Sequence, residues 1–378
     1  MPGGKTPMQI RIEKTNLFEG VQRIQNVVDK KNTIPVLSNI LLESDVENTA
    51  IKLVATNLEV GMSTVLPASE VTEGTITIPA QKIFEILREL PDTSLSLDID
   101  ESHWITLECS KANFKLAGLP RTDFPELPSL PSQGVIVLQQ PVLKDMINKT
   151  AFAVSHDESR YALTGVLFVL GKEELSMVAT DGHRLAVIKK PHNIDLGDDE
   201  TGNEVIIPLK AINEVKKLCD TDEPISINIG ESQIAFRKEQ TSLVSRLIDA
   251  QFPDYRQVVP SESKNIATID KETFNHAIRR VSLLCSDTRL VKFTVTPEQL
   301  TLSSNDPNLG EAEESIPVEY DGEEISIGFN ARYVQDFLSV TEGEKIQLAL
   351  NDSLSPGLFT SESEADVGFS CVIMPMRV

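Results

Sequence analysis

Apolar residues along the chain alternate between helical and strand spacing, and the same order of spacings occurs three times. Each repeat has two segments with helical spacing. The first segments are Leu17–Val28, Leu143–Val154 and Phe274–Cys285, and the second segments begin after Ile78, Ile207 and Ile327. The motifs Ala55-Thr56-Asn57, Ala179-Thr180-Asp181 and Ser303-Ser304-Asn305 each lie 124 residues from the next. The pattern predicts three units of about 125 residues, which is typical of an array that builds a surface.

Between the helical segments, residues alternate at a period of two. Examples are the runs 75–78, 94–97, 225–229 and 300–302. Such runs are typical of antiparallel strands with one buried face, and the turn pairs Glu73-Gly74, Asp181-Gly182 and Asp321-Gly322 separate them. We expect about eight short strands and two helices in each unit, which is an α+β fold with helices packed on one side of antiparallel sheets.

The predicted helices are amphipathic, so each should turn one face to a sheet. The inward positions of the fifth helix are Phe274, Ala277, Ile278 and Val281, and those of the fourth are Ile212, Val215 and Cys219. On the far side, the fourth helix has a polar stripe of Lys210, Asn213 and Lys217.

The repeat places domain boundaries near Leu130 and Pro260 in the 378-residue chain. We expect an N-terminal domain over 1–130, a middle domain over 131–260 and a C-terminal domain over 261–378. Residues 1–7 contain two prolines and two glycines and are interpreted as a disordered leader or the product of an upstream start. A hydrophobic content of 40% supports real cores, and no apolar run reaches the 18 residues that a membrane span needs.

The net charge of −22 argues at first against a nucleic-acid partner. Six helical segments, taken with their first turns as 15–28, 80–90, 141–154, 208–219, 271–285 and 330–341, nevertheless contain twelve Lys or Arg and only seven Asp or Glu. One explanation is that Lys and Arg are good helix formers, although Glu is equally good. If all three units present their helices to the same side, the array has one basic and one acidic face.

The four cysteines, Cys109, Cys219, Cys285 and Cys371, are far apart and lack the spacing of metal ligands. They are interpreted as buried free thiols of a protein in a reducing cytoplasm. The five histidines form no cluster in the sequence, so neither a metal nor another cofactor is expected.

Several stretches match one protein family. They are Val178–Val187 (VATDGHRLAV), Phe252–Arg256 (FPDYR), Val372–Val378 (VIMPMRV), Ile34–Leu42 (IPVLSNILL) and Ala55–Glu59 (ATNLE). In this order and at these separations they resemble the bacterial DNA polymerase III beta subunit family, the replicative sliding clamps. The resemblance extends from Met8 to Val378. Gln81, Gln257 and Val378 depart from the residues common in the family.

The resemblance implies three clamp-type domains that form a crescent, and two crescents that join as a homodimeric ring with helices around the hole. Such a ring is no enzyme. It encircles double-stranded DNA without sequence preference, tethers the replicative polymerase and so provides processivity. The resemblance also implies that the clamp loader, other polymerases and repair proteins bind through short peptide motifs, in the cytoplasm near the nucleoid.

The resemblance further implies three sets of site residues. A partner-peptide cleft between the middle and C-terminal domains would use Leu163, Thr180, Gly182, His183, Arg184, Leu185, Pro253, Val258, Leu354, Pro356, Val372, Met374, Pro375, Met376 and Arg377. DNA contacts would come from Lys30 and Lys31, where the family has a basic loop, and from Lys210, Lys217, Arg279 and Arg332 by helix position. The dimer contact would join Phe114 and Leu116 to Leu283 and Leu284.

Three alternatives remain open from the sequence, and the first is an enzyme. The run Asp181–Arg184 resembles an acid–base group, but no nucleophile lies near it in the sequence and no GxSxG elbow occurs. Gly165–Lys172 resembles a phosphate loop, but five residues separate Gly165 from Gly171 and Glu173 replaces the required hydroxyl residue. A scaffold that binds only proteins, and a specialised second clamp in the same cell, are the other two readings.

Overall fold

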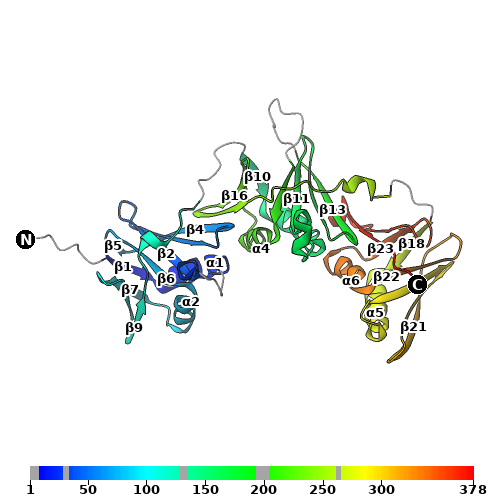
Figure 1. Ribbon diagram of the computed structural model, residues 1–378, viewed down its shortest axis with the longest axis horizontal. Helices are drawn as coiled ribbons and strands as arrows, with labels where there is room; N and C mark the ends of the chain where they lie inside the picture. Colours follow the sequence, from blue (N-terminus) through cyan, green and yellow to red (C-terminus); the bar gives the residue numbers. More distant parts are fainter. Residues whose placement is uncertain (1–7, 29–33, 128–134, 193–203, 261–264) are drawn as a thin grey trace, which may run out of the picture. The chain divides into compact units, whose positions relative to one another are not determined.

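Antiparallel strand pairing organises the described part of the chain into four sheets (Figure 1). The computed structural model describes residues 8–28, 34–127, 135–192, 204–260 and 265–378. By their contacts, the residues divide into two compact units. Unit 1 consists of Met1–Pro141 with Asn213–Leu247, and unit 2 consists of Val142–Ile212 with Ile248–Val378.

Unit 1 contains a five-stranded and an eight-stranded sheet. The five-stranded sheet has the order β5 (Glu70–Val71), β1 (Met8–Glu13), β7 (Ser94–Ile99), β8 (Trp104–Cys109) and β9 (Ala112–Ala117). The eight-stranded sheet has the order β10 (Val135–Gln139), β15 (Pro224–Ile229), β16 (Gln233–Lys238), β17 (Thr241–Arg246), β4 (Val60–Pro67), β3 (Ala50–Thr56), β2 (Asn39–Asp45) and β6 (Thr75–Pro79).

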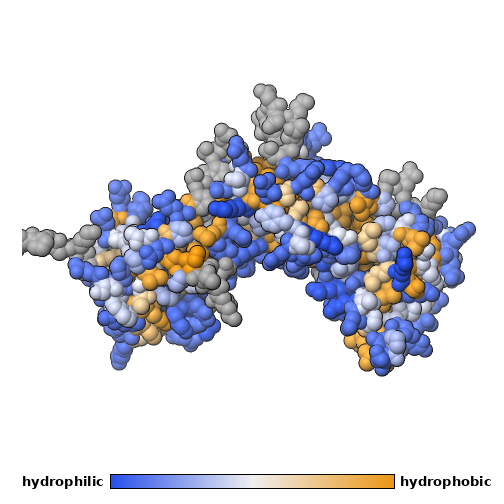
Figure 2. All heavy atoms as spheres, in the orientation of Figure 1, coloured by the Kyte–Doolittle hydropathy of each residue, from blue (hydrophilic) through white to orange (hydrophobic). Residues whose placement is uncertain are grey.

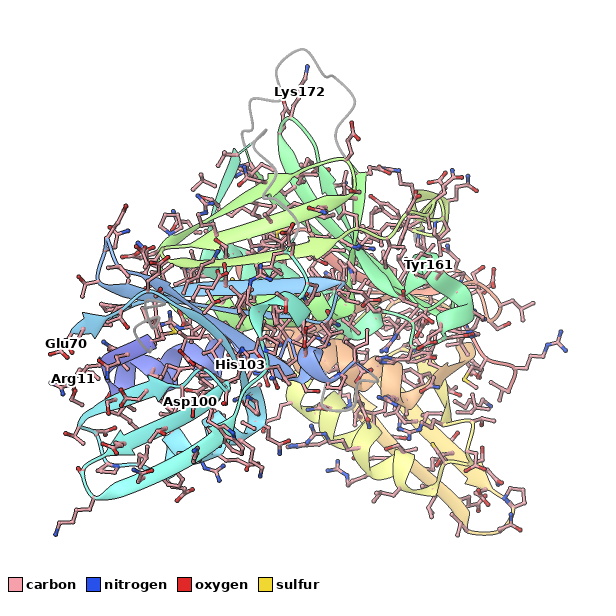
Figure 3. The ribbon with its side chains drawn as sticks, turned by 60° about the vertical axis from the view of Figure 1, so that its left-hand side comes forward. Arg11, Glu70, Asp100, His103, Tyr161 and Lys172 are labelled. Carbon is pink, nitrogen blue, oxygen red and sulfur yellow. The ribbon has the colours of Figure 1, made fainter. Side chains whose placement is uncertain are left out.

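Polar contacts support the smaller sheet of unit 1 at its edge and at one turn (Figure 3). Arg11 on β1 forms an ion pair of 3.4 Å with Glu70 on β5. In the β7–β8 turn, Asp100 accepts hydrogen bonds from the backbone N–H groups of Ser102 and Trp104, and His103 has φ 64°. The carboxylate therefore replaces backbone partners in a turn that includes a left-handed residue.

Unit 2 also contains an eight-stranded sheet and a smaller one. The larger has the order β14 (Glu204–Pro208), β11 (Gly165–Leu170), β12 (Glu174–Thr180), β13 (Arg184–Pro191), β25 (Phe369–Ile373), β24 (Gly357–Ser361), β23 (Lys345–Leu350) and β18 (Asn265–Asp270). The smaller has the order β21 (Gly310–Pro317), β20 (Gln299–Asp306), β19 (Leu290–Thr296) and β22 (Ile325–Asn330). The run from Gly165, which only resembles a phosphate loop in the sequence, forms strand β11.

The two large sheets each continue across a predicted domain boundary. Strand β17 pairs with β4, and strand β13 pairs with β25, so the predicted middle domain contributes strands to both units. The boundaries near 130 and 260 remain a prediction, because strands from the two sides of each boundary are hydrogen-bonded in one sheet.

The six predicted helices are all present, in the expected chain order. They are α1 (Lys14–Ile24), α2 (Ala80–Glu89), α3 (Gln140–Asn148), α4 (Leu209–Leu218), α5 (Lys271–Val281) and α6 (Ala331–Val340). The predicted ends at Val28, Val154 and Cys285 were too late. After α1, α3 and α5 the chain tightens to i→i+3 hydrogen bonds, for example from Cys285 N to Ser282 O, which still satisfies the last carbonyl groups.

Helices pack against sheets through the faces that the sequence predicts. Helix α1 contacts strands of both sheets of unit 1. Helix α5 contacts both sheets of unit 2, through β18 in the larger sheet and β20 in the smaller one. The predicted inward residues of α5 are at most 1% exposed, and Ile212, Val215 and Cys219 are at most 2% exposed. In unit 2 a chain of ring contacts at 5.3–5.9 Å runs through Phe274, Phe293, Phe329, Phe359, Phe337 and Phe369.

One charged cluster is buried in unit 2. The side chain of Lys149 is 1% exposed, and its Nζ lies 2.8 Å from Asp145 Oδ1 and 2.9 Å from Asp366 Oδ1. Asp366 Oδ2 also accepts hydrogen bonds of 3.0 Å from the N–H groups of Glu342 and Gly343. The paired charges and these donors make burial of an ammonium group tolerable, and they tie the end of α3 to the segment before β25.

Most of the visible face is hydrophilic, with hydrophobic residues in smaller patches (Figure 2). Among the residues that the structure describes, no helix has the length and apolar character of a membrane span. All four cysteines are free thiols. Cys109, Cys219 and Cys371 are buried as predicted, whereas Cys285 is half-buried because it lies beyond α5 in a turn.

Candidate functional site

The pairing of β13 with β25 brings together two segments of the predicted peptide cleft. Leu185 pairs with Val372, and Arg184 pairs with Ile373. Beyond the last strand pair, Met374 N donates a hydrogen bond of 2.9 Å to His183 O. The middle and final parts of the predicted cleft are therefore neighbours within unit 2.

An apolar cluster lies beneath this junction. Leu185 is 3% exposed, Val372 is 1% exposed, and both belong to one buried cluster with Tyr255. The partly buried residues Ala162, Phe252, Val259 and Leu358 pack against it. By contrast, Val258, Met374 and Leu354 are 41%, 40% and 80% exposed. A contiguous patch of exposed apolar groups would be typical of a protein-binding surface, and in the sequence Val258 directly precedes Val259 and Met374 lies two residues after Val372.

The turn between β12 and β13 is held by its own side chains. Asp181 Oδ1 accepts hydrogen bonds from His183 N and Arg184 N, at 2.9 and 3.0 Å. Thr180 Oγ1 donates to Arg184 O at 2.6 Å and accepts from Gly182 N. Gly182 has φ 86°, a conformation that glycine adopts without strain. Asp181 is therefore engaged in shaping a hairpin, which argues against an acid–base role.

The Arg184 side chain makes several hydrogen bonds and ring contacts within the predicted cleft. Its side chain is 7% exposed and donates to Asp181 Oδ2 at 3.1 Å, Asp336 Oδ2 at 2.6 Å and Phe152 O at 2.5 Å. The guanidinium carbon also lies 4.4 Å from the ring centre of Tyr333. Burial raises the pKa of the Tyr333 hydroxyl, and the nearby Asp181 adds to the shift. The donors of Arg184 are thus engaged within the protein, and its guanidinium supports the wall of the site.

The other predicted cleft residues differ in burial and in their contacts. Leu163 is half-buried at the end of a 3₁₀ segment, and its carbonyl accepts from Ser155 N. Met376 N donates a hydrogen bond of 2.8 Å to Gly328 O, so the end of the chain lies against strand β22. Pro253 and Arg377 are exposed, and Pro356 and Pro375 are half-buried. Pro253, Leu354, Pro356 and Arg377 are not members of the buried cluster.

Sequence reasoning missed Phe152, Tyr333 and Asp336, which surround the Arg184 guanidinium. Tyr333 and Asp336 lie three residues apart on α6, so they share one helix face. That spacing was available as a signal, but nothing in the sequence pairs α6 with the hairpin after β12.

Four of the six predicted DNA-contacting cations lie on helices, with different surroundings. Lys217 on α4 lies 2.6 Å from Glu214, and Arg332 on α6 lies 4.0 Å from Asp336. Arg279 on α5 is exposed, and Lys210 on α4 is half-buried. Lys30 and Lys31 fall outside the described residues. On α2, Gln81 Nε2 donates to Glu85 at 2.8 Å, so this departure from the family pattern is bonded within its own helix.

The residues predicted at the dimer contact lie on or near the end strands of two sheets, in the order that the described residues give. Phe114 and Leu116 are half-buried on β9, the last strand of its sheet. Leu284 is half-buried and Leu283 is 76% exposed, in the turn after α5. Helix α5 packs against β21, which is the edge strand of the four-stranded sheet.

Models of one protein family match nearly the whole chain. The N-terminal, central and C-terminal domains of the DNA polymerase III beta subunit match residues 8–128, 137–254 and 256–377. Curated relatives named beta sliding clamp include those of Chlamydia muridarum and Caulobacter vibrioides. They are 33% and 35% identical, and each comparison covers 98% of this chain and 99% or more of the relative.

Solved structures agree with the sequence relatives. A DnaN sliding clamp from Pseudomonas aeruginosa bound to griselimycin superimposes with a TM-score of 0.92 at 30% identity. A DNA polymerase sliding clamp from Bacillus subtilis superimposes with a TM-score of 0.91 at 30% identity. Each superposition covers 99% of this chain and all of the other. The chain therefore belongs to the DNA polymerase III beta subunit family, the non-catalytic sliding clamps that encircle DNA as homodimers and hold the polymerase on it.

Proposed function

We propose that this clamp captures its partner proteins by short peptides that bind over the β13–β25 junction of unit 2. The observation that carries the proposal is the hydrogen bond from Met374 N to His183 O, which brings the predicted cleft segments side by side. The exposed side chains of Met374, Val258 and Leu354 would contact apolar peptide side chains. Methionine suits this role because its flexible, polarisable side chain adapts to different ligands.

The affinity of a single peptide should be modest. Burial of two apolar anchors contributes roughly 3–6 kcal/mol before the cost of ordering the peptide. We therefore expect a Kd near the micromolar range, about −8 kcal/mol in binding free energy. Two copies of the site in a homodimer would allow one partner with two motifs to bind by avidity.

Binding of a fluorescent peptide from the polymerase, measured by anisotropy, tests the cleft. Met374→Ala should weaken binding about tenfold, because part of the apolar contact is lost. Val367→Ala removes an apolar side chain that is 64% exposed and outside the cluster, so it should leave the affinity unchanged. Equal affinities for the wild type and Met374→Ala would remove Met374 from the site.

A deletion tests the chain end as a whole. Removal of Met374–Val378 should abolish stimulation of the polymerase while a folded dimer remains. The deletion removes the hydrogen bonds from Met374 N and Met376 N but leaves every strand of the described sheets in place. Full stimulation by the truncated protein would contradict the proposed cleft.

DNA contact is proposed for the helix cations Lys210, Lys217, Arg279 and Arg332, and for Lys30 and Lys31. Contacts to phosphate groups are independent of base sequence and weaken with salt, which suits a ring that slides. The carboxylates of Glu214 and Asp336 beside Lys217 and Arg332 compete with DNA for these cations. Replacement of Arg279 by Gln should reduce the slope of log affinity against log salt by about 1.

The homodimer is proposed to form between the β9 edge of one copy and the β21 edge of the other. The exposed side chains of β9 and the turn before it include Lys111 and Lys115, and those of β21 include Glu311 and Glu313. Opposite charges on the two edges favour pairing between copies over pairing of like edges. Phe114, Leu116, Leu283 and Leu284 would supply the apolar part of the contact.

We further propose the division into domains over 1–130, 131–260 and 261–378, and a cytoplasmic location with the chromosomal DNA. The resemblance of each third of the chain to one clamp domain supports the division. A fluorescent fusion that colocalises with replicating DNA would support the location.

A further inference from the structure

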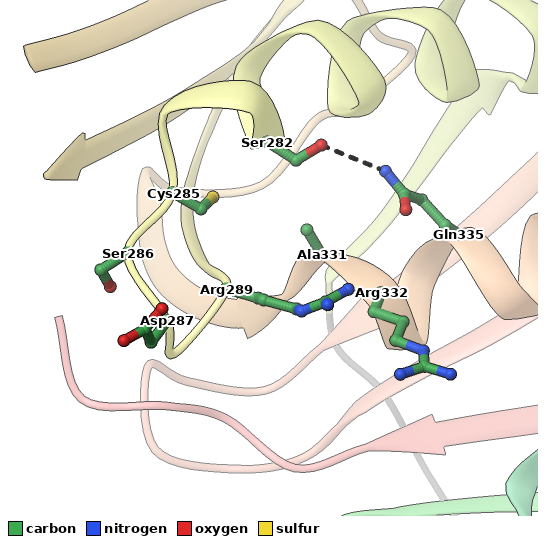
Figure 4. A pocket seen from close by; sticks show the side chains of 8 residues that line it. All are labelled: Ser282, Cys285, Ser286, Asp287, Arg289, Ala331, Arg332 and Gln335. Carbon is green, nitrogen blue, oxygen red and sulfur yellow. Dashed lines mark hydrogen bonds between the residues drawn. The ribbon is translucent and has the colours of Figure 1, made fainter. Parts of the chain in front are cut away.

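A polar cavity of ≈ 320 Å³ lies where the end of α5 meets the start of α6 (Figure 4). Its lining residues are Ser282, Cys285, Ser286, Asp287, Arg289, Ala331, Arg332 and Gln335. Arg289 extends from the loop before β19 toward the first turn of α6, where Arg332 begins. Two guanidinium groups from different elements therefore line one cavity.

The backbone of Arg289 is fixed at this position. Its φ of 56° lies in the left-handed region, which costs a residue other than glycine roughly 1–2 kcal/mol. Two hydrogen bonds of 2.9 Å stabilise it, one from Arg289 N to Ser286 O and one from Ala331 N to Arg289 O. The second bond joins the loop directly to the start of α6. The side chain of Arg289 therefore begins beside the positive end of a helix dipole.

Neither guanidinium group has a carboxylate of its own, because Asp336, which lies beside Arg332, already accepts a hydrogen bond of 2.6 Å from Arg184. Arg289 makes no side-chain ion pair or hydrogen bond within the part of the chain that the structure describes, and the separation of Arg332 from Asp336 is 4.0 Å. Asp287 is the one acidic residue that lines the cavity. The chain has 57 acidic against 35 basic residues, so two neighbouring cations without a carboxylate of their own are unexpected. An external anion would relieve the repulsion between them.

We propose that this cavity binds a phosphate group. Guanidinium groups bind phosphate through paired N–H donors, and a serine hydroxyl in the cavity lining adds a further donor. Ser282 Oγ accepts a hydrogen bond of 3.3 Å from Gln335 Nε2 and donates its own proton to Arg279 O. The Ser282 hydroxyl is therefore already engaged within the protein. Ser286 therefore offers the more available hydroxyl, although it shares a hydrogen bond of 2.7 Å with Thr288.

The phosphate could belong to a DNA backbone or to a free phosphate compound. For the DNA source, the inference rests on the proposed function, since Arg332 is one of the proposed DNA-contacting residues. Binding of inorganic phosphate does not depend on that proposal.

Titration of the intact dimer with inorganic phosphate, followed by ³¹P NMR at constant ionic strength, tests the site. We expect saturable binding that weakens about tenfold in Arg289→Gln and again in Arg289→Gln with Arg332→Gln. Asp287→Asn should tighten binding several-fold, because it removes the opposing carboxylate. Arg256→Gln, which removes a guanidinium paired with Glu204 outside the cavity, serves as the charge-matched control.

Binding that is absent, or equal in the wild type and the double variant, would overturn the proposal. The source of the phosphate is decided by the salt dependence of binding to duplex DNA. A slope that falls by about 1 in Arg289→Gln identifies the DNA backbone. If Arg289→Gln loses phosphate binding but keeps the wild-type slope for DNA, the ligand is a free phosphate compound. If the proposed helix contacts to DNA were wrong, Arg279→Gln would leave the slope unchanged while phosphate binding persisted.

Discussion

Arg184 Nη1 donates a hydrogen bond of 2.6 Å to Asp336 Oδ2, although the two residues are 152 positions apart in the chain. Arg184 follows the hairpin turn that carries His183, and Asp336 lies on α6. The bond therefore joins two parts of unit 2 beside the proposed peptide site. Because the Arg184 side chain is almost completely buried between Asp181 and Asp336, loss of the guanidinium would leave both carboxylates without this partner.

Arg184→Ala should lower the free energy of unfolding by about 3 kcal/mol, since it removes a buried guanidinium and exposes the partners it satisfied. Urea unfolding followed by circular dichroism measures the change. Arg256→Ala breaks an exposed ion pair with Glu204 and should cost less than about 0.5 kcal/mol. Equal stabilities of the two variants would show that the buried network is dispensable.

The Lys149–Asp366 pair should make stability depend on acid pH. Burial alone would raise the pKa of Asp366, but the ammonium of Lys149 and the Gly343 N–H outweigh it and hold that pKa below the ordinary 3.8. A carboxylate with a lowered folded-state pKa stabilises the fold above its unfolded pKa. That stability is lost as the pH falls from about 4 through the folded-state pKa.

Asp366→Asn should therefore lower stability at pH 7 by about 3 kcal/mol and flatten the decline of stability below pH 4. The measurement is urea unfolding at a series of pH values. Glu319→Gln, which affects the exposed pair with Lys345, should leave both the stability and the slope nearly unchanged. An acid slope that is as steep in Asp366→Asn as in the wild type would refute the assignment.

The double change Leu283→Ala with Leu284→Ala should dissociate the dimer without unfolding the chain. Leu283 is 76% exposed, so its truncation removes little buried contact within one copy. Sedimentation velocity should show monomers where the wild type sediments as a dimer. Val46→Ala, at an apolar residue that is 49% exposed in unit 1, is the control and should remain dimeric. An intact dimer of the double variant would disprove the interface.

Burial raises the pKa of Cys371 to about 12, so this thiol should be unreactive in the native protein at pH 8. Burial also raises the pKa of Cys285, but that thiol is only half-buried. Native labelling with a thiol reagent, followed by mass spectrometry, should modify Cys285 first and Cys371 only after unfolding. Labelling of both thiols at one rate would contradict this order.

Local patterns in the sequence predict the helices and their buried faces well. Phe274, Ala277, Ile278 and Val281 follow helical spacing, and all four are at most 1% exposed in α5. Helix ends were predicted less well, because the shift to i→i+3 bonding after Ile24, Asn148 and Val281 leaves the apolar spacing unchanged.

Contacts between distant parts of the chain could not be predicted from the same patterns. The spacing of β13 and β25 predicts two strands, but it does not indicate that Leu185 lies opposite Val372. Arg184 was assigned to peptide contact from its motif, whereas its partners Asp336 and Tyr333 come from a helix far along the chain. Such pairings depend on the tertiary arrangement, which residue spacing alone does not specify.

The lifetime of the loaded clamp on circular DNA, before and after the circle is cut, tests the central claim most directly. An enclosing ring leaves a circle only by opening, but it slides off a free end. We expect long retention on the intact circle and rapid loss after linearisation, with little dependence on base sequence. The same lifetime on circular and linear DNA would contradict encirclement and would favour a protein that grips the duplex or binds only other proteins.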